Sequence, residues 1–186
     1  MTCTFVSNPM SDLEGQLQKA YDDLGIEGEN QDSINAYLTI VRNRDEDTYE
    51  HSVRVGILGV DPKALFYSGV LHDTGKALTD EKSLKKTEGF DEKDMRELQR
   101  HPKDGYRLIK GVHDFSAEVI LRHHRYVGEG YPKQLPRTDI DFSEGTQAMI
   151  TYFSRILGLI DFYDAVNHRE NDKFSEDGKP RLPTPD

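Results

Sequence analysis

The chain has 186 residues, the length of one ordinary domain, and its 35% hydrophobic and 31% charged residues predict one modest core under a large solvated surface. It contains a single cysteine, no apolar run of about 18 residues and no leader-like N-terminus, so we expect a cytoplasmic protein without a membrane span or an internal disulfide. A net charge of −10 argues against a DNA or RNA duplex or a membrane surface as partner, but allows a small anionic substrate beside a bound metal ion.

Apolar residues recur at helical spacing through most of the chain, and we identify no convincing alternating strand pattern. We therefore predict an all-α fold. Helix caps are expected at Ser11, at Asp32 or Ser33, at Asp91 and at Ser116. The expected helices cover about residues 11–25, 32–41, 47–59, 62–73, 91–101, 102–111, 116–123 and 144–167.

Two segments differ in composition from the helical parts. Residues 125–143 are rich in glycine and proline and predict a loop. The last segment, 171–186, combines prolines with charges and has almost no apolar residues, which is typical of a flexible tail. We therefore expect a helical extension over residues 1–30, a main domain over 31–170 and a tail over 171–186.

Histidine and aspartate follow a demanding order along the predicted helices. A histidine on one helix precedes a His-Asp pair, a histidine before proline, a His-His pair and an aspartate on the last helix. A lone inward histidine is more often a core residue, but several buried imidazoles and carboxylates destabilise a bundle unless they are paired or bind metal. Such ligands suit Fe, Mn, Zn or Ni. The predicted ligands are His51, His72, Asp73, His101, His123, His124 and Asp161.

Helical spacing adds three candidates. Asp47 lies four residues before His51 and Asp164 three after Asp161, so both could face a metal ion; a helix cap and a solvated face are the respective alternatives. Lys76 lies four residues after His72 and is expected to bind an anion, with a surface ion pair as the alternative.

The chemistry expected of this set is phosphodiester hydrolysis. Asp73 can bridge two ions with its two oxygens, and two ions can share a water, lower its pKa and direct it at phosphorus. Lys76 would hold a phosphate oxygen or assist the leaving oxygen. Asp73 and Lys76 are thus the candidate catalytic residues, and a second carboxylate such as Asp104 could orient an imidazole.

Four motifs together resemble the HD-GYP branch of the HD superfamily: HDTGK at 72–76, HPKDGY at 101–106, HHRYVGEGYP at 123–132 and DFYDA at 161–165. The resemblance covers about residues 47–173. It implies an all-α HD fold with two or three metal ions, often iron or manganese, and hydrolysis of cyclic di-GMP to pGpG or GMP.

The resemblance also implies roles for individual residues. The seven predicted ligands match the family's metal ligands, Asp47 and Asp164 match positions that bind a third ion, and Lys76 matches a contact to the substrate phosphate. Gly130 and Tyr131 match positions near the substrate, and Arg169 and Lys173 loosely resemble a basic pair that follows the last aspartate.

The chain departs from the family pattern in the loop that names the branch. Arg125 stands where the family has glutamate, Val127 stands where it has aspartate, and the stretch is one residue shorter. These departures bear on the substrate and on partner binding more than on the metal ligands. An oligomer or a regulatory partner is left open.

Other functions compete with this reading. A di-iron oxygenase of the HD superfamily has a similar ligand order and would consume dioxygen. A nucleotide phosphohydrolase is a further enzyme, although it needs fewer histidines. A catalytically silent module would bind a cyclic dinucleotide without cleaving it, and the altered loop motivates this alternative.

Overall fold

The computed structural model describes residues 9–59, 63–128, 130–168, 175–176 and 179–180. Within these ranges the protein is a bundle of helices with one two-stranded hairpin, so the predicted all-α fold is confirmed. The helices are α1 (Pro9–Leu24), α2 (Glu29–Arg44), α3 (Glu46–Leu58), α4 (Lys63–Leu71), the 3₁₀ helix η1 (Thr74–Leu78), α5 (Glu81–Leu84), α6 (Glu92–Leu98), α7 (His101–Ile109), α8 (Asp114–Arg122) and α9 (Glu144–His168); β1 (Ser175–Glu176) pairs with β2 (Lys179–Pro180).

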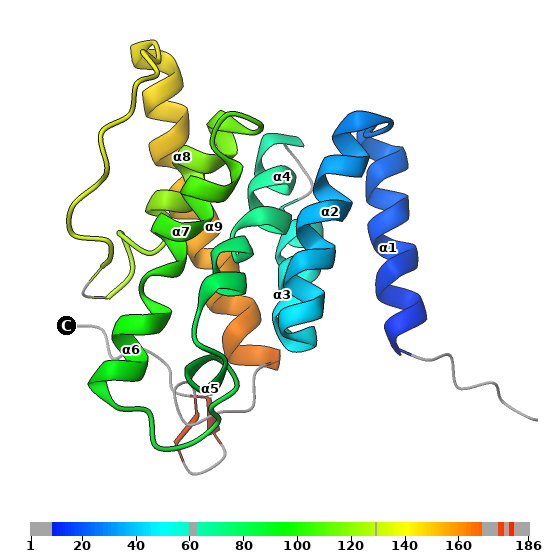
Figure 1. Ribbon diagram of the computed structural model, residues 1–186. Coiled ribbons are helices and arrows are strands. Elements are labelled where there is room, and N and C mark those ends of the chain that lie inside the picture. Colours follow the sequence, from blue (N-terminus) through cyan, green and yellow to red (C-terminus); the bar gives the residue numbers. More distant parts are fainter. Residues whose placement is uncertain (1–8, 60–62, 129, 169–174, 177–178, 181–186) are drawn as a thin grey trace, which may run out of the picture.

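Four helices surround the centre of the molecule. α3 packs along α4, α4 against α8, α8 against α9, and α9 back against α3. α7 covers α8 and receives η1, while α2 and then α1 extend the bundle at the opposite end (Figure 1). Because α3, α4, α7, α8 and α9 all contribute to the interior, residues far apart in the sequence can meet there.

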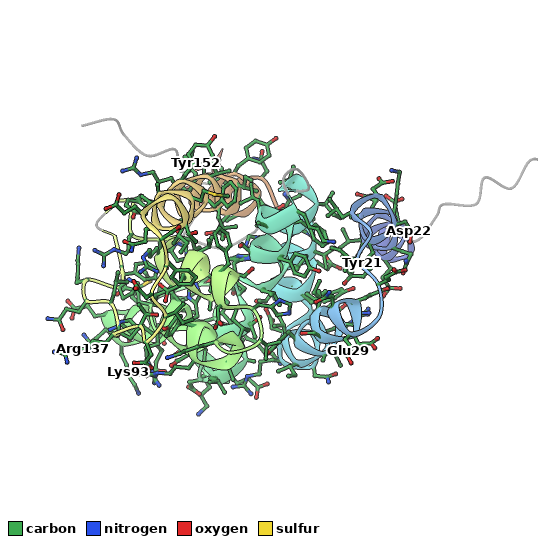
Figure 2. All side chains as sticks on the ribbon, turned by 90° about the horizontal axis from the view of Figure 1, so that it is seen from above. Tyr21, Asp22, Glu29, Lys93, Arg137 and Tyr152 are labelled. Atoms are coloured by element: carbon green, nitrogen blue, oxygen red, sulfur yellow. The ribbon has the colours of Figure 1, made fainter. Side chains whose placement is uncertain are left out.

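The N-terminal helix shares the hydrophobic core. Leu17, Ala20 and Tyr21 of α1 are buried in it, and the ring of Tyr21 meets Phe66 of α4 edge-on at 5.9 Å between centroids. In Figure 2 Tyr21 lies between α1 and the rest of the bundle. The predicted boundary at residue 30 is not tested by these contacts and stays a prediction.

Several helix starts differ from the predicted caps. α1 already begins at Pro9, so Ser11 lies inside it. α2 begins after Gly28, which places Asp32 in its first turn, where a carboxylate favours the positive end of the helix dipole, and Ser33 just beyond it. α8 begins at Asp114, and Ser116 is buried inside it. In each case helical residues precede the polar residue that resembles a cap.

The segment that follows α4 is more broken than its pattern indicated. α4 ends at Leu71 instead of continuing to Asp73, and η1 and the single turn of α5 were not predicted. Asp91 does cap α6: its carboxylate accepts hydrogen bonds from the backbone N–H groups of Lys93 at 2.8 Å and Asp94 at 2.9 Å. The last helix, predicted over 144–167, is confirmed as α9.

Two predictions concern residues outside the described ranges. Arg169 and Lys173 are not described, and of the predicted tail 171–186 only the two strands of the hairpin are. Among the described residues, no helix combines the length and the apolar character that crossing a membrane requires.

Candidate metal centre

The predicted metal ligands converge at one place from five segments. His51 comes from α3, His72 and Asp73 from the corner between α4 and η1, His101 from the start of α7, the His-His pair from the end of α8, and Asp161 from α9. Their ligand atoms form three overlapping groups, each within 4.8 Å: His51–His72–Asp161, His72–Asp73–His123 and His101–His123–His124.

Three of the imidazoles are oriented by the same local device. Each follows a helix by one to three residues, and its Nδ1–H donates a hydrogen bond to the backbone carbonyl three residues earlier. This hydrogen bond fixes the tautomer, so the Nε2 lone pair of each ring is directed into the cluster. The Nδ1–O distances are 2.7 Å from His72 to Gly69, 2.6 Å from His101 to Leu98 and 2.5 Å from His123 to Ile120.

Two of these Nε2 atoms show what the cluster is suited to bind. Nε2 of His101 and Nε2 of His123 are buried and have no hydrogen-bond partner among the described residues. A buried acceptor without a partner costs free energy, of the order of 1 to 3 kcal/mol. A divalent cation would satisfy both lone pairs, so the donor set fits a metal ion.

Asp73 and Asp161 each face both sides of the cluster. Asp73 Oδ1 lies 3.4 Å from Nε2 of His101, while its Oδ2 lies 3.4 Å from Nε2 of His72. Asp161 Oδ1 lies 2.9 Å from Nε2 of His51 and its Oδ2 lies 3.7 Å from Nε2 of His124. Ligands bound to one ion at about 2.1 Å are roughly 3.0 to 3.5 Å apart. The two Asp73 separations lie in this range, and the two Asp161 separations lie just below and just above it.

The cluster therefore has two halves. We call the group formed by His51, His72 and Asp161 Oδ1 the carboxylate-rich half, and the group formed by His101, His123 and His124 the imidazole-rich half. Asp73 lies between them. An ion in each half would share the Asp73 carboxylate.

The pKa of His72 is shifted in the opposite direction from the pKa values of the imidazole-rich half. Burial alone would lower the pKa of His72, but the adjacent carboxylates of Asp73 and Asp161 outweigh it and raise that pKa above its ordinary value. Burial lowers the pKa of His123 to about 4, and it holds the pKa values of His101 and His124 well below the ordinary value. The imidazole-rich half thus presents neutral rings, the form that binds metal.

Both central carboxylates are ionised. Burial alone would raise the pKa of Asp73, but His72 and Lys76 hold it well below its ordinary value. Burial alone would also raise the pKa of Asp161, but hydrogen bonds from His51 and His72 hold it well below the usual range. The centre therefore combines negative charge with neutral imidazole, a donor set for a divalent cation.

Asp164 does not lie among the ligand atoms of these three groups. It is fully buried, its Oδ2 is 2.7 Å from Nδ1 of His51, and Nε of Arg54 donates to its Oδ1 at 2.9 Å. Burial alone would raise its pKa, but His51 and Arg54 together lower it. The solvated-face alternative is therefore wrong: Asp164 lies behind His51, on the side of the ring away from the cluster.

Asp47 is exposed on the wall of the cleft above the cluster and also belongs to none of the three groups. It is not the cap of α3 either, because Asp45 has that place and accepts a hydrogen bond from Thr48 N at 3.0 Å. The structure thus brings seven predicted ligands together and leaves Asp47 and Asp164 outside the three groups.

A cleft of about 620 Å³ opens onto the cluster. Lys76, His124, Tyr131 and Asp161 are among the residues that line it. Nζ of Lys76 lies 2.5 Å from Asp73 Oδ2 and the side chain is largely buried, so the surface-pair alternative does not describe it. The Lys76 ammonium and several of the predicted ligands thus face the same cleft.

The loop with the GYP tripeptide forms one wall of this cleft. The ring of Tyr131 stacks on the imidazole of His124, with 4.6 Å between centroids. Gly130 has φ 58°, and a Cβ there would collide with the carbonyl of Arg125, so only glycine fits. Arg125 donates to the carbonyl oxygens of Pro132 at 2.5 Å and Lys133 at 3.1 Å. Arg125, which the resemblance aligns with a glutamate, therefore joins the two ends of this loop.

Sequence reasoning missed residues that position the ligands. A Cβ on Gly75 would collide with the carbonyl of His101, so this glycine lets η1 approach the start of α7. Its place in the HDTGK motif was the available signal.

Two other polar residues do not support the cluster. Asp104, a candidate to orient an imidazole, instead accepts a hydrogen bond from Arg107 at 3.0 Å. His113, outside the motifs, is hydrogen-bonded to Ser33 Oγ at 2.8 Å.

A helical bundle that gathers imidazoles and carboxylates from five segments defines a class of metal-binding proteins. The sequence matches the family described as the HD domain over residues 48–166, which is more than half of the chain. The chain therefore belongs to the HD domain family.

The curated relatives are phosphodiesterases by name. The chain is similar to the cyclic di-GMP phosphodiesterase PA4108 of Pseudomonas aeruginosa, with 32% identity over 71% of this chain and 34% of that protein. It is similar to the cyclic di-GMP phosphodiesterase response regulator RpfG of Xanthomonas campestris, with 30% identity over 61% of this chain and 29% of that protein. It is also similar to the 3'3'-cGAMP-specific phosphodiesterase 1 of Vibrio cholerae, with 29% identity over 68% of this chain and 30% of that protein. The chain spans about a third of the length of these relatives, and no solved structure gave a significant match.

Proposed function

We propose that this chain hydrolyses a phosphodiester bond of a cyclic dinucleotide with the help of two divalent metal ions. The observation that carries the proposal is the position of Asp73, whose two oxygens face the two halves of the cluster at the floor of an open cleft. The names of the relatives support the substrate class. The lone cysteine favours a reducing compartment, and we place the reaction in the cytoplasm.

The two halves would hold the ions, with iron or manganese as our first choice. His51, His72 and Asp161 would hold one ion, and His101, His123 and His124 the other, with Asp73 shared. Ions bound there would act as Lewis acids toward a phosphoryl oxygen and make water acidic enough to serve as a nucleophile near neutral pH.

The chain's own residues would bind and orient the substrate. The Lys76 ammonium, held beside Asp73, is placed to hold a non-bridging phosphate oxygen. Tyr131 presents a ring at the cleft wall that a purine base could contact, and its own orientation is fixed by stacking on His124. A cleft of about 620 Å³ is within the usual range for small-molecule sites, roughly 300 to 1,000 Å³.

We propose two ions instead of three. Asp164, one of the candidates for a third ion, already accepts hydrogen bonds from His51 and Arg54. Its role in the proposal is to hold the His51 ring so that Nε2 faces the carboxylate-rich half. Asp47 on the cleft wall belongs to none of the three ligand groups, so the proposal gives it no ion.

The substrate is proposed to be cyclic di-GMP, cleaved to the linear dinucleotide pGpG or on to GMP, with cyclic GMP-AMP as the nearest competitor. The test is anaerobic incubation of iron- or manganese-loaded protein with each dinucleotide, followed by product analysis. Lys76→Ala and Asp73→Asn serve as site controls, and Lys85→Ala at the cleft rim is the matched lysine control.

The outcomes separate the competing functions. Cleavage of either dinucleotide that depends on Asp73 supports the proposal. Tight binding without cleavage by fully loaded protein contradicts it in favour of a silent binding module. Substrate-dependent consumption of dioxygen, measured in a parallel aerobic incubation, contradicts it in favour of an oxygenase.

A further inference from the structure

The outer side of α9 exposes large apolar side chains. Met149 is 50% exposed, Tyr152 61%, Leu159 65% and Tyr163 60%, while the inner side of the same helix carries the buried residues of the core and the metal centre. In Figure 2 Tyr152 points away from the bundle, on the side of α9 that faces solvent. We call these four residues together with Ile156 the α9 stripe.

The α9 stripe has the spacing of a coiled-coil seam. Its members follow one another at intervals of three, four, three and four residues along 149–163. This is the a/d repeat that lets a helix pack against another helix of the same kind. The stripe lies on the outer side of the helix, and four of its five side chains are exposed; Ile156 is half-buried and packs against the core.

Charge is scarce along this helix. Over residues 146–163 the only charged side chains are Arg155 and the buried Asp161, although 31% of the chain is charged. Arg155 lies over the ring of Tyr126, with 5.0 Å from its Cζ to the centroid. The centres of protein interfaces are depleted in acidic residues and lysine and enriched in tyrosine, methionine and arginine, which is the composition found here.

We propose that the α9 stripe is the interface between two copies of this chain, related by a two-fold axis that brings α9 against α9. A heptad-spaced seam is complementary to a second copy of itself, and a two-fold axis places the same patch on both sides. Because the contact carries almost no charge, the acidic residues that give each copy its net charge of −10 lie outside it. The proposal does not depend on the proposed hydrolysis.

The area is consistent with a modest dimer. At these exposures the four large side chains offer roughly 450 Å² per copy, on a scale of about 150 to 250 Å² for a whole tyrosine. Arg155, Ile156 and Tyr126 extend this toward the ~800 Å² per partner of a standard interface. We therefore expect a dimer that dissociates on dilution.

The test is sedimentation velocity of the full chain over a range of concentrations. The expected result is a monomer–dimer equilibrium whose dissociation constant rises about tenfold or more in Tyr152→Glu and in Leu159→Glu. Ile40→Glu is the matched control, because Ile40 is also 50% exposed but lies on α2, and it should dimerise like the unaltered chain. Circular dichroism checks that each variant is folded.

A second measurement tests the same interface without introducing a charge. In a Cys3→Ser background, oxidation should cross-link two copies of Leu159→Cys, or Leu159→Cys with Tyr152→Cys, by a disulfide, whereas Ile40→Cys should form the dimer without a cross-link. A chain that is monomeric at all concentrations, a dimer that the stripe variants leave unchanged, or equal loss with Ile40→Glu would overturn the proposal.

Discussion

The two halves of the cluster differ in their third ligand, which is aspartate in one and histidine in the other, and in their surroundings. In the carboxylate-rich half, His51 is held by Asp164 on one side and meets Asp161 on the other, and both rings of that half are fully buried. In the imidazole-rich half the pKa values of the rings are lowered by burial, and His124 is partly open to the cleft.

This difference predicts a division of work. Negative charge concentrated around His51 and His72 favours tight, enclosed binding of one ion. Neutral imidazoles beside the open cleft favour an ion that exchanges more readily and that substrate can reach. Asp73 couples the halves, because one of its oxygens faces each of them.

The largest effect is expected from Asp73→Asn, because this change alters both halves at once. We predict a loss of turnover of about 10³-fold or more, together with loss of the shared ligand and most bound metal. Metal analysis and product formation are measured on the same sample. Turnover and metal content equal to those of the unaltered protein would falsify the shared-carboxylate assignment.

A smaller effect is expected from Lys76→Ala, which should leave the metal content unchanged. Loss of the cation beside the phosphate is expected to lower kcat/KM by about 10- to 100-fold, because one charge-assisted contact is removed. Steady-state kinetics with Lys85→Ala as the matched control measure this. Equal losses in both variants would mean that Lys76 acts only through general charge.

Asp164→Asn tests the carboxylate-rich half alone. It should weaken binding of the tighter ion by about 10- to 100-fold, the range found for residues that orient a metal-binding histidine, and leave the number of sites at two. Competition with a metal-binding dye measures both quantities. Asp104→Asn is the control, since Asp104 is paired with Arg107. A drop from three sites to two would show that Asp164 holds an ion.

The smallest effect concerns acid stability of the metal-free protein. The folded pKa of His123 is about 4, below its unfolded value of about 6.5, so the unfolded state takes up a proton first and stability falls as pH falls through that window. We predict a loss of about 2 kcal/mol between pH 7 and pH 5 from His123. Urea unfolding measures it, and His123→Gln should flatten the dependence, whereas an equal slope would contradict the assignment.

The sequence predicted which residues gather in the cluster better than it predicted the residues that support them. His51, His72 and Asp161 are recognisable because their order along the helices is itself a pattern, and the apolar periodicity placed most helices. The roles of Arg54 behind Asp164 and of Arg125 at the loop depend on contacts between distant segments, which periodicity does not encode. The 3₁₀ helix η1 was missed because five residues are too few for a periodic signal.

The most direct test of the two-ion account is turnover of cyclic di-GMP measured while manganese is added stepwise to metal-free protein without oxygen. We predict little product during the first equivalent, which fills the carboxylate-rich half, and a steep rise during the second. Full turnover at one equivalent, or none at two with intact substrate binding, would contradict the account.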